Sequence, residues 1–148
     1  MISIATQLEN AQKETGIYID VISNEQFDSI KQKIFLNHKL KIKDTSNFIW
    51  QDFPENINIY GEYAWMHIPK ILDENKLYIL FFNQIECKNA YGFYDANNLC
   101  TLLGETYDFE FYITDLDGSF ILCFNHEELL CGCGSIINKI KEYRTSIT

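Results

Sequence analysis

Two apolar runs toward the C-terminus dominate the hydropathy pattern of the chain. Phe109–Thr114 and Ser119–Phe124 are rich in aromatic and β-branched residues, and Asp115-Leu116-Asp117-Gly118 lies between them. Because Asp-Gly supplies the positive φ angle that a tight turn needs, this pattern predicts a β-hairpin.

The apolar runs differ in the faces that they should bury. In the first, apolar residues alternate with Glu110, Tyr112 and Thr114, which predicts one buried face and one half-polar face. Phe120–Phe124 and Leu77–Phe82 are apolar throughout, so we expect two central strands covered on both faces. Five residues of these strands are predicted to be largely buried: Leu80, Phe82, Phe111, Leu122 and Phe124.

Helical periodicity explains most of the other apolar positions. Ile4, Leu8 and Ala11 recur at helical spacing, and Gly16 is placed to end that helix. Ser23 with Gln26 three residues later forms a capping box at the start of a second helix. Two later helices are predicted to begin after capping residues: Asp95 and Ser135.

Weaker signals lie between these elements. Ile17–Ile22 and Tyr91–Tyr94 are typical of short strands, and Ala64–Leu72 of a short helix that Pro69 begins or kinks. Cys131-Gly132-Cys133 is interpreted as a tight turn before the last helix.

The stretch Asp44–Gly61 leaves two structural alternatives open. It is either a long loop pinned by Trp50 in the core, or two short edge strands at Phe48–Trp50 and Ile57–Tyr60. Taken together, the elements predict one α+β domain over residues 1–148. Its central sheet should be mostly antiparallel or mixed, with helices packed against it.

Charge is distributed unevenly along the chain, whose net charge is −9. Lys31–Lys43 holds five of the 12 basic residues, whereas Asn89–Asn138 contains no Lys or Arg. The basic span is interpreted as a solvated helix face and loop, with an anion site as the alternative. The acidic stretch favours a basic partner and disfavours nucleic acid, although solubility alone also explains such a composition.

The sequence also constrains the cellular setting. No apolar run approaches the roughly 18 residues of a membrane helix, and the N-terminus lacks the pattern of a secretory signal. The five cysteines show no repeated metal-binding spacing, so they are expected to be reduced and mostly buried. We therefore expect a cytoplasmic protein without a metal or cofactor.

Asn125-His126-Glu127-Glu128, directly after a predicted central strand, is the best candidate for chemistry. Two adjacent carboxylates favour the cationic form of His126, which suits an ion pair or a general acid better than a metal ligand. Three roles for His126 are weighed: structural hydrogen bonding, contact with a partner, and catalysis or metal binding. No Ser, Thr or Cys nucleophile has a base at a recognisable motif spacing.

Three segments carry a resemblance to a known family: LYILFFN, LLGETYDFEFYITD and FILCFNHEELLCGCG. They resemble a family of small uncharacterised bacterial cytosolic proteins with the patterns GET-F-FEFYVT and LLCFNHHD. Asn125 and His126 match the second pattern, but Glu127 replaces its second His, which argues against a paired-His site. From Leu77 onward the chain is thus similar to this family, which looks related to immunity proteins of polymorphic toxins.

Charge and resemblance together indicate a non-enzymatic binding protein. The resemblance implies an immunity protein that neutralises a basic toxin domain, such as a nuclease, through an acidic surface. The alternative is a small hydrolytic enzyme that uses His126 with nearby carboxylates. The residues expected to contact the partner are Glu105, Tyr107, Asp108, Tyr112, Asp115, Asp117, His126, Glu127 and Glu128.

Overall fold

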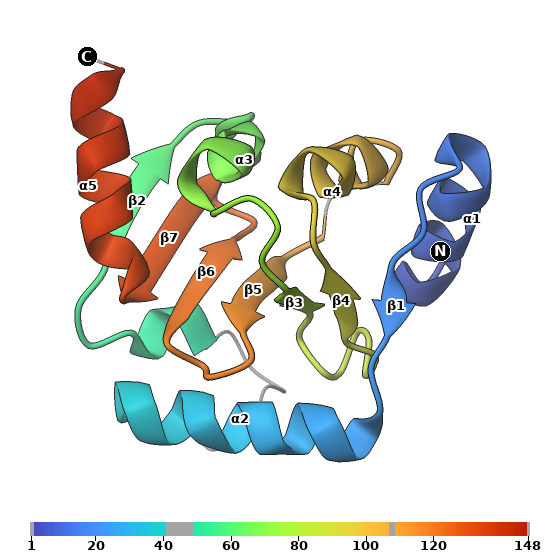
Figure 1. The fold of residues 1–148 in the computed structure, drawn as a ribbon, viewed down its shortest axis with the longest axis horizontal. Coiled ribbons are helices and arrows are strands. Elements are labelled where there is room, and N and C mark those ends of the chain that lie inside the picture. The colour runs from blue at the N-terminus through green and yellow to red at the C-terminus, as the bar shows by residue number, and fades with distance from the viewer. Residues whose placement is uncertain (1, 41–48, 107–108, 148) are drawn as a thin grey trace.

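The computed structural model describes residues 2–40, 49–106 and 109–147 (Figure 1). The helices are α1 (Ile4–Thr15), α2 (Asn24–His38), α3 (Ile68–Ile71), α4 (Ala96–Leu103) and α5 (Ile136–Ser146). The strands are β1 (Asp20–Val21), β2 (Ile57–Tyr60), β3 (Tyr78–Phe81), β4 (Tyr91–Phe93), β5 (Phe111–Asp115), β6 (Phe120–Phe124) and β7 (Leu129–Gly134). Within the described residues, two 3₁₀ helices complete the order, η1 (Ile49–Asp52) and η2 (Ala64–His67).

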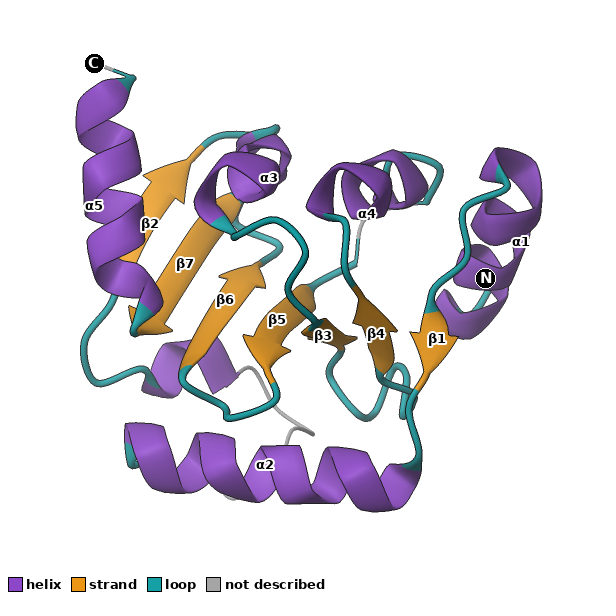
Figure 2. Cartoon of the chain, in the orientation of Figure 1, coloured by secondary structure: helices purple, strands orange, loops and turns teal. Residues whose placement is uncertain are grey.

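The strands form one seven-stranded sheet in the order β1-β4-β3-β5-β6-β7-β2. Every neighbouring pair is antiparallel, and β1 and β2 lie at the two open edges. The predicted α+β class is therefore confirmed. In the view of Figures 1 and 2, α2 and η1 lie below the sheet, α3 and α4 lie above it, and α5 and α1 lie at its left and right sides.

Each face of the sheet has its own hydrophobic core. We call the side covered by α1, α3, α4 and α5 the four-helix face, and the opposite side the α2 face. The four-helix face packs Leu8, Ile68 and Leu102 against strand residues such as Leu80 and Leu122. The α2 face packs its own set of buried residues, among them Phe27, Ile34, Phe81, Tyr112 and Cys123.

Most helix ends follow the predicted capping. Gly16 ends α1 with φ 73°, and the side chains of Ser23 and Asp95 accept the backbone N–H groups of Gln26 and Asn98. Ser135 precedes α5 as predicted, but its hydroxyl makes no capping bond to a described residue of the helix. It bonds instead to Ser119 Oγ at 3.3 Å, which joins the start of α5 to β6.

Strand β5 is buried on both faces, so the predicted half-polar face is wrong. Glu110, Tyr112 and Thr114 are 1%, 0% and 0% exposed, because the α2 layer covers this side. Four of the five predicted core residues are buried as expected: Leu80, Phe82, Phe111 and Leu122. Phe124 is only half-buried, since it lines a surface pocket described below.

The predicted turn at Cys131-Gly132-Cys133 is also wrong, because these residues belong to β7. This strand pairs with β6 on one side and β2 on the other. A Cβ on Gly132 would lie 2.5 Å from Ile140 Cδ1 and 2.7 Å from Ile136 Cγ2. Glycine thus lets α5 pack closely on the strand, and a larger residue would displace these two isoleucine side chains.

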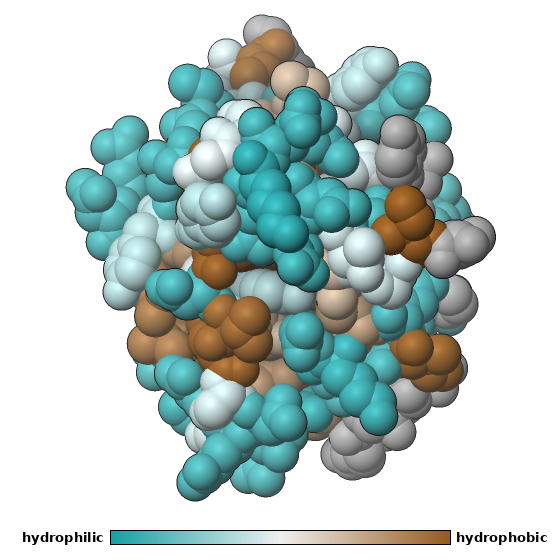
Figure 3. Space-filling view, turned by 90° about the vertical axis from the view of Figure 1, so that its right-hand side faces the viewer, coloured by the Kyte–Doolittle hydropathy of each residue, from teal (hydrophilic) through white to brown (hydrophobic). Residues whose placement is uncertain are grey.

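The two sheet edges correct the remaining strand predictions. Ile57–Tyr60 is the edge strand β2, as one of the two alternatives predicted, whereas 49–52 forms η1 rather than a strand. At the other edge, β1 is limited to Asp20–Val21, which is shorter than predicted. The surface around α1 and β1 is mostly hydrophilic, with small separate hydrophobic patches (Figure 3).

Candidate protein-binding surface

Five of the nine predicted contact residues lie in two turns at opposite ends of the sheet. Asp115–Gly118 joins β5 to β6, and 125–128 joins β6 to β7. Because these strands run antiparallel, successive turns lie at opposite ends. Asp115 and Asp117 are consequently separated by the length of β6 from His126, Glu127 and Glu128.

The first turn is closed by hydrogen bonds to Asp115, which is 4% exposed. One carboxylate oxygen accepts the backbone N–H of Ser119 at 2.9 Å, and the other accepts the Ser119 hydroxyl. Lys76 Nζ lies 3.5 Å from the same carboxylate. Burial alone would raise the pKa of Asp115, but the bonds from Ser119 and the charge of Lys76 outweigh it and hold the pKa below its ordinary value.

Helix α2 holds the backbone of the same turn. Lys33 Nζ donates to the carbonyl of Leu116 at 3.3 Å, and Asn37 Nδ2 donates to that of Asp117 at 2.9 Å. His38 Nε2 donates to the carbonyl of Gly118 at 2.8 Å. Part of the predicted solvated basic face therefore serves as an internal partner of this turn, while Lys41 and Lys43 lie outside the described residues.

The second turn presents its charged side chains to solvent. Asn125 is 3% exposed, and its Oδ1 accepts the backbone N–H groups of Glu127 at 2.9 Å and Leu129 at 3.3 Å. His126, Glu127 and Glu128 are exposed. Internal hydrogen bonds thus shape the turn and leave its two carboxylates directed outward.

A backbone hydrogen bond links this turn to the segment after β2. The N–H of Gly61 donates to the carbonyl of Glu128 at 2.9 Å. Gly61 precedes Glu62 and Tyr63, both of which are exposed. The acidic turn therefore adjoins a third exposed carboxylate and an exposed aromatic ring.

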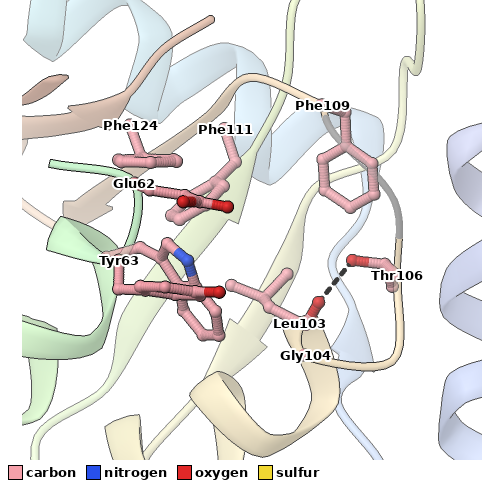
Figure 4. Close-up of a pocket in the computed structure, with 9 residues that line it drawn as sticks. Glu62, Tyr63, Leu103, Gly104, Thr106, Phe109, Phe111 and Phe124 are labelled. Carbon is pink, nitrogen blue, oxygen red and sulfur yellow. Dashed lines mark hydrogen bonds between the residues drawn. The ribbon is translucent and has the colours of Figure 1, made fainter. Parts of the chain in front are cut away.

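A pocket of about 200 Å³ opens beside this segment on the four-helix face. Figure 4 shows Glu62 directing its carboxylate toward the space between Phe111 and Phe124 on one side and Tyr63 on the other. Its lining comes from the segment after β2 with η2, from the end of α4 and the residues that follow it, and from the ends of β5 and β6: Glu62, Tyr63, Trp65, Leu103, Gly104, Thr106, Phe109, Phe111 and Phe124. Glu62 is the one charged side chain among these nine described residues.

The remaining predicted contact residues fall into three groups. Glu105 is exposed and lies between Gly104 and Thr106, at the rim of the pocket. Tyr107 and Asp108 lie outside the described residues. Tyr112 is fully buried and stacks on Phe81, with 5.2 Å between the ring centroids. The prediction that Tyr112 contacts a partner is therefore wrong.

The α2 face holds a buried carboxylate that sequence reasoning treated only as part of a polar face. Glu110 accepts hydrogen bonds from Trp50 Nε1 at 2.8 Å and from the Tyr112 hydroxyl at 2.6 Å. Burial raises the pKa of Glu110, although both hydrogen bonds and the charge of His126 act in the opposite direction. The alternation of β5 placed Glu110 on one face but gave no sign that Trp50 covers it.

The described residues show no group of three or more His, Cys, Asp or Glu side chains placed to hold a metal ion. All five cysteines are free thiols, and four of them are buried. Across the described ranges, no helix combines the length and the apolar composition needed to cross a membrane.

Comparisons with known proteins place the chain in a family. No curated protein matches it, and no solved structure matches it. One family model matches residues 3–144, which extends from the start of α1 into α5 and includes every strand. The chain therefore belongs to DUF6756, a family of unknown function.

Proposed function

We propose that this protein is a non-enzymatic binding protein that neutralises a basic protein domain, as an immunity protein neutralises a toxin such as a nuclease. One observation carries the proposal. The exposed carboxylates of Glu62, Glu105, Glu127 and Glu128 adjoin an aromatic pocket at one end of the sheet. We call this region the acidic end.

The charge of the acidic end supports recognition of a basic partner. Glu105, Glu127 and Glu128 belong to Asn89–Asn138, which contains no Lys or Arg to neutralise them locally. A surface of one sign attracts a partner of the opposite sign and raises the association rate, most strongly at low salt. It also repels nucleic acid, which agrees with a protein that binds a nuclease rather than its substrate.

Aromatic side chains at the acidic end supply anchors for such an interface. Tyr60 and Tyr63 are 77% and 63% exposed, and Trp65 lines the pocket beside them. Tyrosine and tryptophan are enriched among residues that dominate binding energy. These three side chains take the place of Tyr112, which was predicted to contact the partner but is buried.

Charge reversal at the acidic end tests the proposal. The basic partner is first isolated by affinity capture from the native host, and association is then measured with a double variant, Glu127→Lys with Glu128→Lys. We expect association to slow, and the loss to shrink as salt is raised, because charges are screened over about 10 Å at 0.1 M ionic strength. Glu14→Lys with Glu9→Lys on α1 provides the matched control.

The outcome distinguishes this surface from the rest of the molecule. If both double variants slow association equally, the change in net charge explains the effect, and the acidic end is not the binding surface. Failure of the native host to yield any basic partner would contradict the proposed function itself.

A hydrolytic role for His126 is the second candidate function. It is favoured by the electrostatic interaction of His126 with Glu110, a buried carboxyl group whose pKa is raised by burial. A carboxyl group with a raised pKa holds its proton more tightly than an ordinary one, which suits a general acid. Turnover of a nucleic acid or ester substrate that is lost in His126→Ala and Glu110→Gln would favour this candidate over the binding protein.

A further inference from the structure

We propose that the pocket at the acidic end receives an arginine side chain of the partner. This inference rests on the proposed function and specifies how the partner is recognised. It follows from three properties of the pocket, which are its size, its aromatic walls and the sign of its charge.

The size of the pocket fits a single side chain. Pockets that hold drug-sized ligands have volumes of roughly 300–1,000 Å³. The volume here is about 200 Å³. A whole cofactor or nucleotide is therefore too large, whereas one long side chain that projects from another protein fits.

The walls of the pocket are aromatic on several sides. Phe111 and Phe124 pack together with their ring centroids 6.0 Å apart. Phe109 is fixed across the pocket by an edge-to-face contact with Phe82 at 5.4 Å. Tyr63 and Trp65 come from the segment after β2. Aromatic ring faces attract cations, and the planar guanidinium group of arginine also stacks on them.

Two sources of negative charge point to a cation as the occupant. Glu62 directs its carboxylate into the pocket (Figure 4). The carboxyl end of α4 also lies here, since Leu103 and Gly104 line the pocket, and the end of a helix carries a partial negative charge. No Lys or Arg is among the described lining residues, so the structure offers no internal cation.

These features favour arginine over lysine and over an apolar side chain. Arginine pairs with a carboxylate through two parallel hydrogen bonds while its flat face contacts an aromatic ring. Lysine is a strongly hydrated point charge and gains less from aromatic walls. An apolar side chain would bury the Glu62 carboxylate without pairing it, which costs free energy.

The test uses blocked amino acids as probes of the pocket. N-acetyl-arginine methylamide is titrated into the protein, and the NMR signals of Trp65 and Tyr63 are followed. N-acetyl-citrulline methylamide has nearly the same shape without the charge, and the lysine analogue has the charge without the planar group. We expect saturable shifts with arginine and at least threefold weaker binding of both other probes, the size that exposed cation–π pairs give.

Pocket variants assign the binding to named residues. Glu62→Gln and Tyr63→Ala change exposed side chains, so the fold should persist, and circular dichroism checks this. Each should weaken arginine binding roughly three- to tenfold. Glu14→Gln and Tyr18→Ala, at exposed positions on the α1 side, are matched controls that should leave binding unchanged. Equal binding of arginine and citrulline, or equal effects of pocket and control variants, would overturn the inference.

The inference and the proposed function fail in different ways. If Glu62→Gln and Tyr63→Ala leave partner binding intact while charge reversal at Glu127 and Glu128 impairs it, the arginine pocket is wrong and the binding protein stands. If the arginine probe binds as expected but no basic partner exists, the proposed function is wrong and the pocket stands as a cation site.

Discussion

The two acidic turns that flank β6 have similar compositions but opposite surroundings. Asp115–Gly118 is held by α2 and by Lys76, and its first carboxylate is 4% exposed. In the turn at 125–128, the side chain of Asn125 is buried and accepts the hydrogen bonds that shape the turn, whereas the two carboxylates are exposed to solvent. In the first turn the backbone and the Asp115 carboxylate are held within the fold, although Leu116 and Asp117 are exposed, and the second turn directs both of its carboxylates outward.

The two turns show that the role of a charged residue can be assigned only when its contacts within the protein are known. Lys33 and His38 of α2 bond to the backbone of the first turn, and Lys76 lies beside the Asp115 carboxylate. The buried carboxylate of this turn is therefore satisfied within the chain, whereas the Asp117 side chain is exposed.

The second turn is held by a hydrogen bond from the N–H of Gly61 to the backbone carbonyl of Glu128. The side chains of Glu127 and Glu128 take no part in that bond and are exposed. Partner binding is accordingly assigned to the second turn.

The largest difference in stability between variants of the two turns is expected when the positive-φ residue of each turn is substituted. Gly118 has φ 62°, and a Cβ there would lie 3.0 Å from the backbone N of Ile34 in α2. We expect Gly118→Ala to lower the free energy of unfolding by about 2–4 kcal/mol, through left-handed strain and overpacking. Glu128 has φ 58°, and Glu128→Gly should change that free energy by less than about 1 kcal/mol. Urea unfolding measures both, and similar losses would contradict the comparison.

Removal of a turn carboxylate should have the next largest effect. Asp115→Asn loses a charged acceptor for Ser119 and should cost about 2 kcal/mol at pH 7, whereas Glu127→Gln should cost less than about 0.5 kcal/mol. Because the folded-state pKa of Asp115 is depressed, its contribution is present above the ordinary Asp value.

The same pair of variants gives a pH test. The contribution of Asp115 should be lost as pH falls through its depressed folded-state pKa, so the difference between Asp115→Asn and the unsubstituted protein should shrink in acid. Unfolding free energies measured between pH 7 and pH 2 check this. A difference that stays constant over this range would contradict the assigned pKa direction.

Glu110 should show the opposite pH dependence at the other end of the sheet. Its folded-state pKa is raised, so its stabilising contribution is present below the ordinary Glu value and is lost as pH rises through the folded value. Glu110→Gln removes this titration, and the Tyr112 hydroxyl can either donate to or accept from the new amide. The variant should therefore gain stability relative to the unsubstituted protein as pH rises. Urea unfolding at a series of pH values above the ordinary Glu value measures this gain. A loss of stability relative to the unsubstituted protein as pH rises would contradict the raised pKa of Glu110.

Local sequence signals predicted the elements that depend on local chemistry. The Asp-Gly turn, the Gly16 end of α1 and the apolar strands β3 and β6 are set by residues adjacent in the chain. Strand β7 was missed, because its small residues resemble a turn and its place depends on packing against α5. Long-range packing is not encoded in the local pattern.

The candidate site was predictable only in part for the same reason. Glu105, Glu127 and Glu128 were identified from a long stretch without basic residues. The pocket was not, since it combines a segment near Glu62 with the end of α4 and the ends of β5 and β6. Burial of Glu110 was also missed, because its partner Trp50 lies 60 residues away in the chain.

Hydrogen–deuterium exchange of the protein alone and in complex with its captured basic partner tests the central claim most directly. We expect protection to appear at 60–65, 103–106 and 124–129, which together form the acidic end. We also expect 115–119 to exchange equally in both states, since α2 already holds that turn. Protection concentrated at 115–119 or along α2, with the acidic end unchanged, would contradict the account.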